Sequence, residues 1–456
     1  MKTTLKLFVL IPVLIFGLIF FSGCDDDPSS TDPSPPSCRI IFPANNGSVT
    51  DTVMVEIEAN DEIAVTKVLL YIDDVLHYET STAPYEYEWN TRVYDDSTDH
   101  KLYCKAWNQD SLSTVSDTVN VMVDYAAGTG QNVLIVSNYN QGAGTLTIID
   151  LYDIGAVDRD VIGVGNTPND LIFTDNKLLV INSHSHDMNV LKLSYSNAMS
   201  QLADPVDIGI NSNCYPQYGA AAENGYLYIS NFNTDNVTVM DVEALASRIR
   251  SDVGRAPQDV LTIGDKVYIC NSALDSVTYE YGIGSVSILS TVSNMVVNEI
   301  EIGAGKNPQF MALDPQGRIH VVCTGTSDFE TGEVIIPGEV NVIDPATNAI
   351  VSYVYIGGSP GEIAINSDGI AYLAAGGWGD GPGKVFRYDT NNGQILNGPA
   401  NPIEVSAGAM RIVAADDNMI YVSCYNGNSV VKISGGVIVE SYLVGDGPGA
   451  MVIVKR

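Results

Sequence analysis

Few residue patterns in this chain are typical of catalysis or of metal binding. His184 and His186 are the closest pair of histidines, and alternate positions on a strand point the same way. A zinc site needs a third protein ligand, and nothing in the sequence supplies one. No nucleophile elbow of a serine hydrolase is expected, and the 55 acidic residues are too many to single out a catalytic pair. We therefore predict no metal site, no cofactor and no catalytic residue, with an enzyme kept as the alternative.

The seven cysteines form the second group of residues with chemical potential. Cys38 and Cys104 are the only pair within residues 38–125, and an oxidising envelope permits a disulfide between them, with two free thiols as the alternative. Cys24 ends an N-terminal apolar segment. The remaining four are scattered without a C-x-x-C spacing and are predicted to be buried free thiols: Cys214, Cys270, Cys323 and Cys424.

Acidic residues outnumber basic ones by 55 to 22, which gives a formal net charge of −33. This balance excludes a nucleic-acid partner, because phosphate binding needs a basic surface. Hydrophobic residues make up 45% of the chain, which is enough to build a core and argues against disorder.

The N-terminus has the features of a secretion signal. Two lysines precede an apolar run from Leu7 to Phe21, which is short for a spanning helix. The run ends in Phe21-Ser22-Gly23-Cys24, which resembles the lipobox of bacterial lipoproteins, although Phe21 departs from the usual leucine. The resemblance implies removal of residues 1–23 and lipidation of Cys24; the alternative is an ordinary secretory signal with an incidental cysteine. Residues 24–37 are rich in Pro, Ser and Asp and predict an extended tether.

Residues 38–125 alternate between apolar and polar types, as half-buried strands do. The expected strands include Val53 to Ile57, Val65 to Ile72, Lys101 to Ala106 and Thr118 to Val123. The segments FPANNGSV, VTKVLLYID and APYEYEWNT resemble bacterial Ig-like modules. In that family Pro84, Tyr85 and Trp89 are packing residues, so we assign no site here. A spacer is the expected role, and an adhesive surface is the alternative.

The remaining 126–456 segment repeats with a period of about 40 to 50 residues and shows nothing helical of any length. One motif is Val-Gly-x-x-Pro or a variant, with seven copies that end at Pro168, Pro216, Pro257, Pro308, Pro360, Met410 and Pro448. A second motif is a short β-rich string, whose seven copies end at Asn138, Asn182, Asn231, Asn271, Cys323, Ala375 and Cys424. Seven repeats of a four-stranded unit predict a seven-bladed β-propeller.

The ends of this segment also predict that the ring is closed. It starts on a second strand, Val133 to Ser137, and finishes on a first strand, Ala450 to Val454, which can complete the first blade. The motifs resemble the YVTN/YncE-type propeller family, whose repeat reads YVTN…VxVID…VGxxP. That family includes relatives of lactonases and BtuG-like surface cobalamin-binding lipoproteins. No catalytic motif of those relatives occurs in this sequence, so the resemblance implies the fold and no functional residue.

In this fold the residues after each Pro and the loops after each second strand surround one mouth of the central channel. Amide and aromatic side chains at such a mouth suit a neutral, ring-bearing or sugar-like ligand, although the aromatic residues could instead pack against neighbouring loops. Arg411 is the only base among the post-Pro residues; we expect it to pair with a neighbouring acid, and a carboxylate clamp is the alternative. The predicted ligand-binding residues are Tyr139, Asp170, Tyr218, Phe232, Asp259, Gln309, Glu362, Trp378, Arg411 and Tyr425.

The sequence thus predicts an all-β chain: an Ig-like β-sandwich followed by a seven-bladed β-propeller. The expected function is that of a bacterial cell-envelope lipoprotein, anchored in the outer membrane through its acylated cysteine on the periplasmic or the surface face. Its propeller would bind a small molecule, a glycan or a protein partner without chemistry, and an outer-membrane transporter is one such partner. The alternatives are a lactonase-like propeller hydrolase and an adhesive or structural surface protein.

Overall fold

The computed structural model describes residues 34–455 apart from eleven short internal segments. These are residues 50–51, 92–93, 95–97, 124–131, 140–141, 152–155, 194–197, 209–212, 246–247, 329–330 and 377–380. The expected signal segment, the lipidation site Cys24, most of the tether and the expected ligand-binding residue Trp378 lie outside the described residues. Within the described part of the chain, no helix combines the length and the apolar character that crossing a membrane requires.

The chain divides into two compact units whose main boundary falls between Val123 and Asp124. The described part of the first unit contains nine strands in two sheets, one ordered β1-β3-β6 and the other β2-β9-β7-β4-β5 with β8 added to β7. The strands are β1 (Ser37–Phe42), β2 (Gly47–Val49), β3 (Thr52–Asn60), β4 (Val65–Ile72), β5 (Val75–Thr80), β6 (Tyr85–Asn90), β7 (Thr98–Asn108), β8 (Ser113–Val115) and β9 (Val119–Val123).

The core of this sandwich follows from the alternation in its strands. Along β3 every second residue is buried, including Val55 and Ile57, which is the pattern of a sheet with one face on a core. Trp89 on β6 is almost completely buried, so its expected packing role is confirmed. Pro84 is exposed and Tyr85 is half-buried, so the packing expectation for Pro84 is wrong.

Cys38 on β1 and Cys104 on β7 belong to different sheets of the sandwich and lie close together. The Cys38 thiol donates to the backbone oxygen of Cys104 at 3.7 Å and to that of Thr114 at 3.4 Å. Both are free thiols, so the structure contains the expected neighbours without the disulfide. The other four described cysteines are buried free thiols, in agreement with the prediction.

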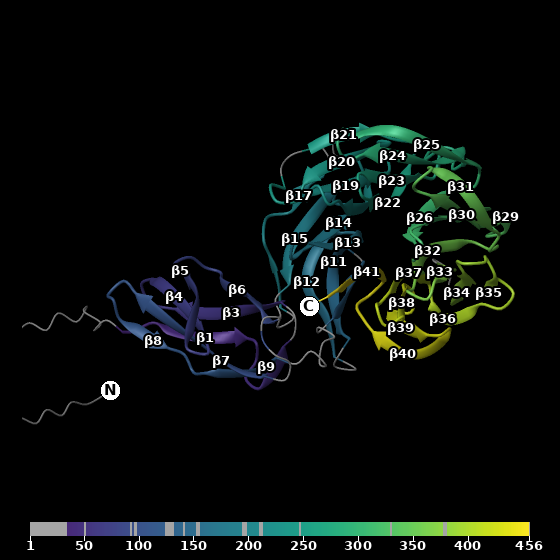
Figure 1. The fold of residues 1–456 in the computed structure, drawn as a ribbon. Coiled ribbons are helices and arrows are strands. Elements are labelled where there is room, and N and C mark those ends of the chain that lie inside the picture. The colour runs from purple at the N-terminus through teal and green to yellow at the C-terminus, as the bar shows by residue number, and fades with distance from the viewer. Residues whose placement is uncertain are drawn as a thin grey trace, which may run out of the picture. The chain divides into compact units, whose positions relative to one another are not determined.

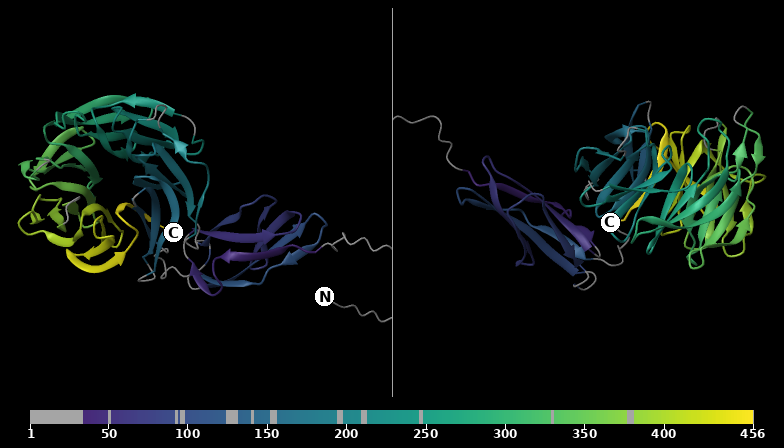
Figure 2. Two further views of the ribbon diagram at one scale, coloured as in Figure 1. Left: turned by 180° about the vertical axis from the view of Figure 1, so that it is seen from behind. Right: turned by 90° about the horizontal axis from the view of Figure 1, so that it is seen from above.

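The described strands of the second unit form a ring of seven sheets, each with four or five strands, and a separate two-stranded hairpin (Figure 1). The first sheet is ordered β41-β10-β11-β12 from the centre outward; the later sheets begin at the centre with β13, β18, β22, β26, β32 and β37. These innermost strands touch one another in sequence, and β37 touches β41, so the described strands close the ring. Figure 2 shows the sheets of this ring from two further directions.

The strands of the first four sheets have the following bounds: β10 (Val133–Asn138), β11 (Ala143–Asp150), β12 (Val157–Asn166), β13 (Pro168–Thr174), β14 (Lys177–Asn182), β15 (Asp187–Leu193), β16 (Met199–Gln201), β17 (Val206–Asp207), β18 (Pro216–Ala221), β19 (Tyr226–Asn231), β20 (Asn236–Asp241), β21 (Arg248–Asp252), β22 (Pro257–Ile263), β23 (Lys266–Asn271), β24 (Ile283–Ser290) and β25 (Met295–Ala304).

The strands of the last three sheets, together with the small hairpin β28-β29, have these bounds: β26 (Pro308–Leu313), β27 (Ile319–Cys323), β28 (Thr326–Ser327), β29 (Val334–Ile336), β30 (Glu339–Asp344), β31 (Ala349–Val354), β32 (Pro360–Ile365), β33 (Ile370–Ala375), β34 (Pro382–Asp389), β35 (Ile395–Asn397), β36 (Ile403–Ala407), β37 (Ala409–Ala414), β38 (Ile420–Cys424), β39 (Ser429–Ser434), β40 (Val437–Leu443) and β41 (Pro448–Val454).

The closing strand lies where the sequence places it. β41 pairs antiparallel with β10, with Val133 opposite Val454 and Ile135 opposite Val452. Seven hydrophobic clusters fill the junctions between successive sheets, and one of them joins the last sheet to the first. The second strand of each sheet is buried on both faces, which explains its mostly apolar sequence.

The two repeated motifs pack against each other. The Asn182 side chain donates to Asn189 at 2.8 Å and so ties the second strand of its sheet to the third. A Cβ on Gly165 would stand 2.6 Å from Asn182 Cγ, so only glycine leaves room for this asparagine. The same close approach recurs between Gly254 and Asn271 and between Gly445 and Asn138. The Val-Gly of one motif is therefore required by the terminal Asn of the other.

Candidate functional site

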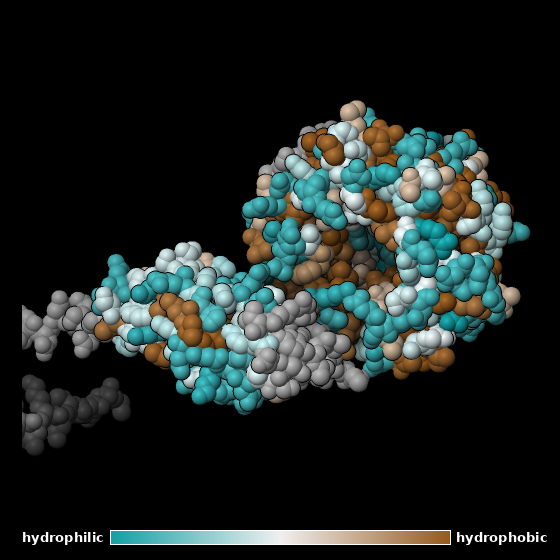
Figure 3. All heavy atoms as spheres, viewed as in Figure 1, coloured by the Kyte–Doolittle hydropathy of each residue, from teal (hydrophilic) through white to brown (hydrophobic). Residues whose placement is uncertain are grey.

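The second residue after each Pro, or its equivalent, occupies the same place on every innermost strand, so these residues form a ring around the channel. In ring order they are Asp170, Tyr218, Asp259, Phe310, Glu362, Arg411 and Ala450. Figure 3 shows that the ring of sheets is hollowed at its centre. Six of the seven side chains are large or charged; Tyr218, Phe310 and Glu362 lie against Arg411, and Asp170 is close enough to act on its charge.

Arg411 extends from β37 across the channel and is 2% exposed. Its Nη2 donates to the backbone oxygen of Asn169 at 3.0 Å and to the Asn169 side-chain oxygen at 3.2 Å. The guanidinium carbon lies 4.7 Å from the ring centre of Tyr218 and 5.4 Å from that of Phe310, which are cation–π distances. Its Nη1 lies 3.7 Å from Glu362 Oε1. The side chain therefore joins strands from four other sheets.

Three carboxyl groups in this ring link neighbouring sheets through backbone N–H groups. Asp170 accepts from Gly219 N at 2.9 Å on the next innermost strand. Asp259 accepts in the same way from Met311 N at 2.7 Å, and Glu362 accepts from Ile412 N at 2.6 Å. These three links join the second sheet to the third, the fourth to the fifth and the sixth to the seventh.

Burial makes these carboxyl groups hold their protons more strongly than usual. It raises the pKa of Asp170 to about 6, against the opposing effects of the Gly219 N–H and of Arg411. It raises the pKa of Glu362 to about 7, again against Arg411. Asp259 reaches a pKa of about 8, because burial is reinforced by its carboxylate neighbours Asp170 and Glu362. At neutral pH the ring therefore carries fewer charges than its residue types suggest.

Two groups of aromatic side chains, which we together call the aromatic arc, accompany this ring: Tyr139 with Tyr425, and Tyr215 with His184, His186 and Phe232. The ring centres of Tyr139 and Tyr425 are 5.7 Å apart, in an edge-on contact. Tyr215 makes edge-on contacts with His184, His186 and Phe232 at 5.3, 6.2 and 6.4 Å. Tyr139 connects the arc to the ring, because its hydroxyl donates to the Asn169 oxygen at 2.8 Å, the oxygen that also binds Arg411.

Most of the predicted site residues are brought together. Tyr139, Asp170, Tyr218, Asp259, Glu362 and Arg411 form one network, but Tyr139, Tyr218 and Arg411 are buried within the channel rather than exposed at its mouth. Tyr425 and Phe232 lie half-buried in the arc. Gln309 is separate, because its side chain donates to Asn307 at 3.0 Å. Arg411 binds an amide and a backbone oxygen more closely than the acid that was expected as its partner.

Tyr215, the centre of the arc, was not among the predicted residues. It directly precedes Pro216 and adopts a left-handed backbone conformation with φ of 53°. Thr167, Ala256 and Asn307 share this conformation at the same place in other repeats. Its position is thus a repeat feature, and comparing the residue before each Pro would have found its large side chain.

The histidine pair is placed against Tyr215. His186 Nδ1 accepts from Tyr215 N at 3.2 Å, and the Tyr215 hydroxyl lies 3.3 Å from His184 Nδ1. Among the residues that the structure describes, no group of three or more His, Cys, Asp or Glu is placed to hold a metal ion. Gly357–Gly361 has the spacing G-x-S-x-G, but Ser359 precedes strand β32 and no helix follows, so it forms no nucleophile elbow.

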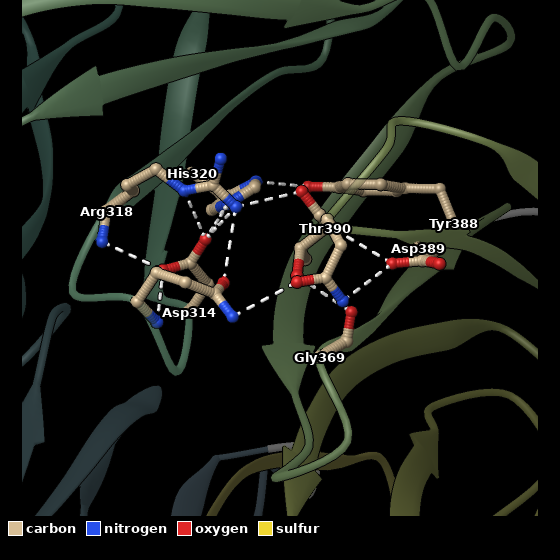
Figure 4. Close-up of polar contacts among 9 residues, drawn as sticks. Asp314, Arg318, His320, Gly369, Tyr388, Asp389 and Thr390 are labelled. Atoms are coloured by element: carbon tan, nitrogen blue, oxygen red, sulfur yellow. Dashed lines mark hydrogen bonds and ion pairs between the residues drawn. The ribbon is translucent and has the colours of Figure 1, made fainter.

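A second polar cluster lies between the fifth and sixth sheets (Figure 4). His320 is fully buried, with Nδ1 2.6 Å from the Tyr388 hydroxyl and Nε2 3.0 Å from Asp314. Arg318 donates to Asp314 at 2.7 Å and to the backbone oxygen of Thr390 at 2.9 Å. Burial lowers the pKa of His320, so the imidazole is neutral with both nitrogens occupied. This cluster holds the two sheets together and offers no free group for chemistry.

An adjoining cavity of about 470 Å³ is lined by Gln316, Arg318, Asp344, Val351 and Asn391. Among the lining residues that the structure describes, Arg318 is the one base, and Asp314 already neutralises its charge. The cavity therefore presents no group that points to a particular ligand.

Known protein families and solved structures support an Ig-like fold for the first unit and a propeller-like fold for the second. The bacterial Ig domain family matches residues 36–148. The match extends into β10 and β11, but these strands pair with β41 and β12 and so belong to the ring of sheets. No curated protein matches the chain.

Solved structures similar to the chain include propeller-like proteins. A proposed 6-phosphogluconolactonase from Bacteroides uniformis is 11% identical, with 71% of this chain and 100% of the other covered at a TM-score of 0.54. One from Bacteroides fragilis is 13% identical, with 72% and 99% covered at a TM-score of 0.50. A protein of unknown function from Desulfotomaculum acetoxidans is 10% identical, with 71% and 99% covered at a TM-score of 0.52. At these identities the likeness shows the fold alone. The all-β prediction, an Ig-like domain followed by a β-propeller, is confirmed.

Proposed function

We propose that the propeller is a binding head that takes a ring-bearing small molecule against the aromatic arc, without catalysing a reaction. The observation that carries this proposal is the arc itself, with Tyr215 in edge-on contact with three other rings. Half-buried aromatic rings offer apolar area and an edge or face for stacking, while nearby amides supply hydrogen bonds. Asn169 is occupied by Tyr139, Arg411 and Gln217, so the half-buried Gln217, which accepts from Asn169 Nδ2 at 3.1 Å, is the amide on this side of the channel.

The carboxyl groups of the channel support binding over hydrolysis. Asp170 and Asp259 each accept two backbone N–H groups, one from the next residue and one from the next sheet. A carboxylate held in this way is occupied on both oxygens and is poorly placed to activate water or to hold a metal. Their role is to link sheets, which leaves the aromatic arc as the surface available to a ligand.

A thermal-unfolding screen of the full chain tests this proposal. The panel contains aromatic acids, nucleosides, corrinoids, other tetrapyrroles and oligosaccharides, because all present rings. A ligand at 100 times its Kd adds about 2.7 kcal/mol to stability. We expect at least one class to raise the melting temperature, and Tyr215→Ala to abolish the rise. Tyr353→Ala is the matched control, since Tyr353 is an exposed ring on the outer strand β31. A ligand that stabilises both variants equally would contradict the arc as its site.

We also propose that the chain is a lipoprotein of the bacterial cell envelope, held in the outer membrane through Cys24. The support is the apolar run that ends in Phe21-Ser22-Gly23-Cys24 and the polar tether that follows it. The test is incorporation of a labelled fatty acid and recovery in the membrane fraction. Cys24→Ser should lose both, whereas Cys38→Ser should keep both. Membrane recovery of the Cys24→Ser protein would contradict this anchor.

A further inference from the structure

The guanidinium of Arg411 lacks the hydrogen bonds that a buried cation normally has. Its Nη2 uses both hydrogens on Asn169. Its Nε and Nη1 have no hydrogen-bond partner among the described residues, so three of its five N–H donors are unused. An unmade hydrogen bond on a buried charged group is costly, and such groups in folded proteins normally find a partner.

Glu362 is the neighbouring group best placed to meet this charge, and it does so weakly. Its Oε1 lies 3.7 Å from Arg411 Nη1, beyond hydrogen-bond distance, while Oε2 is used by Ile412 N. The Glu362 side chain is 26% exposed, whereas Nη1 and Nε of Arg411 are themselves buried behind it. An anionic group entering the channel therefore reaches Nη1 by displacing Glu362 Oε1, which makes no hydrogen bond to it.

We propose that the channel binds the anionic group of an organic acid on Arg411, and that a proton is taken up by the channel carboxyls as the anion arrives. The anion replaces Glu362 Oε1 as the nearest acceptor of Nη1. The proton comes from solvent and resides on a carboxyl of the ring, chiefly Glu362, so that no second negative charge is buried beside the ligand. The proposal rests on the proposed binding function and adds the chemical class of the ligand: a ring that bears a carboxylate.

The titratable groups around Arg411 are suited to take up a proton when an anion binds. The titratable side chains that face it are Asp170 on β13, Tyr218 on β18, Glu362 on β32 and Tyr139 after β10, with Asp259 on β22 facing the two other acids. The innermost strands β26 and β41 contribute none. Burial raises the pKa of Asp170 to about 6, of Glu362 to about 7 and of Asp259 to about 8, so these carboxyls lose their protons in turn across the neutral range. Lowering the pH removes their negative charge and leaves Arg411 uncompensated, which favours an anion.

Benzoate and benzamide are the probes, because they share a ring and differ in the anionic group. Binding to the full chain is measured by calorimetry from pH 5.5 to 8.5, in two buffers of different ionisation enthalpy to count protons. We expect benzoate to bind more tightly as the pH falls, by at most about tenfold per pH unit for one proton. Benzamide should bind weakly and independently of pH. Arg411→Met should abolish benzoate binding, while Arg387→Met, which removes an arginine outside the channel, should not.

Glu362→Gln keeps the test decisive even where Arg411→Met does not fold. Glutamine retains an oxygen for Ile412 N but cannot titrate. We expect this variant to bind benzoate at pH 8.5 more tightly than the unaltered chain and to take up fewer protons. Equal binding of benzoate and benzamide, unchanged by Arg411→Met, would overturn the anion inference and leave the aromatic arc standing. Failure of both probes and of the whole ring-bearing panel would overturn the proposed function as well.

Discussion

Replacing Asp259 by asparagine should change how the stability of the propeller depends on pH. Asp259 accepts Val260 N at 2.8 Å and Met311 N at 2.7 Å, and burial with two acidic neighbours raises its pKa from 3.8 to about 8. Between these values the unfolded chain is ionised at this residue while the folded chain keeps the proton. Stability therefore falls as the pH rises through this interval and levels off above about 8.

The magnitude follows from the proton difference. One proton held only by the folded state changes the free energy of unfolding by about 1.4 kcal/mol per pH unit. Three pH units, from 5 to 8, would give about 4 kcal/mol, and the partial exposure of the side chain to the channel reduces this to about 2–3 kcal/mol. Asparagine can accept only one of the two N–H groups, which costs a further pH-independent amount of about 1–2 kcal/mol.

Urea unfolding of the full chain and of Asp259→Asn, measured from pH 5 to pH 9, tests this reasoning. The contribution of the first unit is common to both proteins and cancels in their difference. The stability of the full chain relative to the variant should fall by about 2–3 kcal/mol between pH 5 and pH 8, so that the variant becomes the more stable protein at pH 8. Asp446→Asn is the control, because Asp446 is exposed and loses the same charge. Parallel stability curves for the full chain and Asp259→Asn would refute a proton held at Asp259.

Three further substitutions or treatments have defined outcomes. Gly165→Ala should lower stability by about 2–3 kcal/mol in urea unfolding, because its Cβ would displace the asparagine 2.6 Å away, whereas Gly163→Ala meets nothing and should be neutral. Tyr388→Phe should cost about 1–3 kcal/mol by the same assay, since it leaves Nδ1 of buried His320 without its donor; an unchanged midpoint would contradict the role of this cluster. Oxidation should join Cys38 to Cys104 and raise stability by about 2–4 kcal/mol, with the gain lost in reductant and in Cys38→Ser.

The architecture could be predicted because its determinants are local and repeated. The strand Val65–Ile72 agrees residue for residue with its expected bounds, since a clean alternation between turn signals leaves little choice. The pairing of β41 with β10 follows from counting strands at the two ends of the repeats. The repeats also placed Asp170 and Arg411 on one ring, because equivalent positions in a closed ring of sheets face the same channel.

Side-chain partners across sheets could not be predicted in the same way. His320 and Tyr388 are 68 residues apart and carry no shared motif, so their hydrogen bond depends on how two sheets pack. The depth of the ring was also missed: Tyr218 and Arg411 were expected at the mouth and are buried. Residue type gives the polarity of a position in a repeat, whereas burial depends on how far the neighbouring sheets approach one another.

The departures from the repeat are the best sequence signal for the site. The glycine that packs against the asparagine of the second strand cannot change, as Gly165 cannot next to Asn182. Such positions are therefore the same in several copies of the repeat. Positions on the innermost strands make contacts that differ from sheet to sheet, so their residue can differ between copies and can be large or charged, as at Arg411. Arg411 follows the one copy of the Val-Gly-x-x-Pro motif that lacks its Pro. Tyr215 lies directly before Pro216, at a position where the other copies of the motif have no aromatic residue. Both residues reach the centre of the candidate site, because a ring of equal sheets becomes a specific binding site only where its repeats differ.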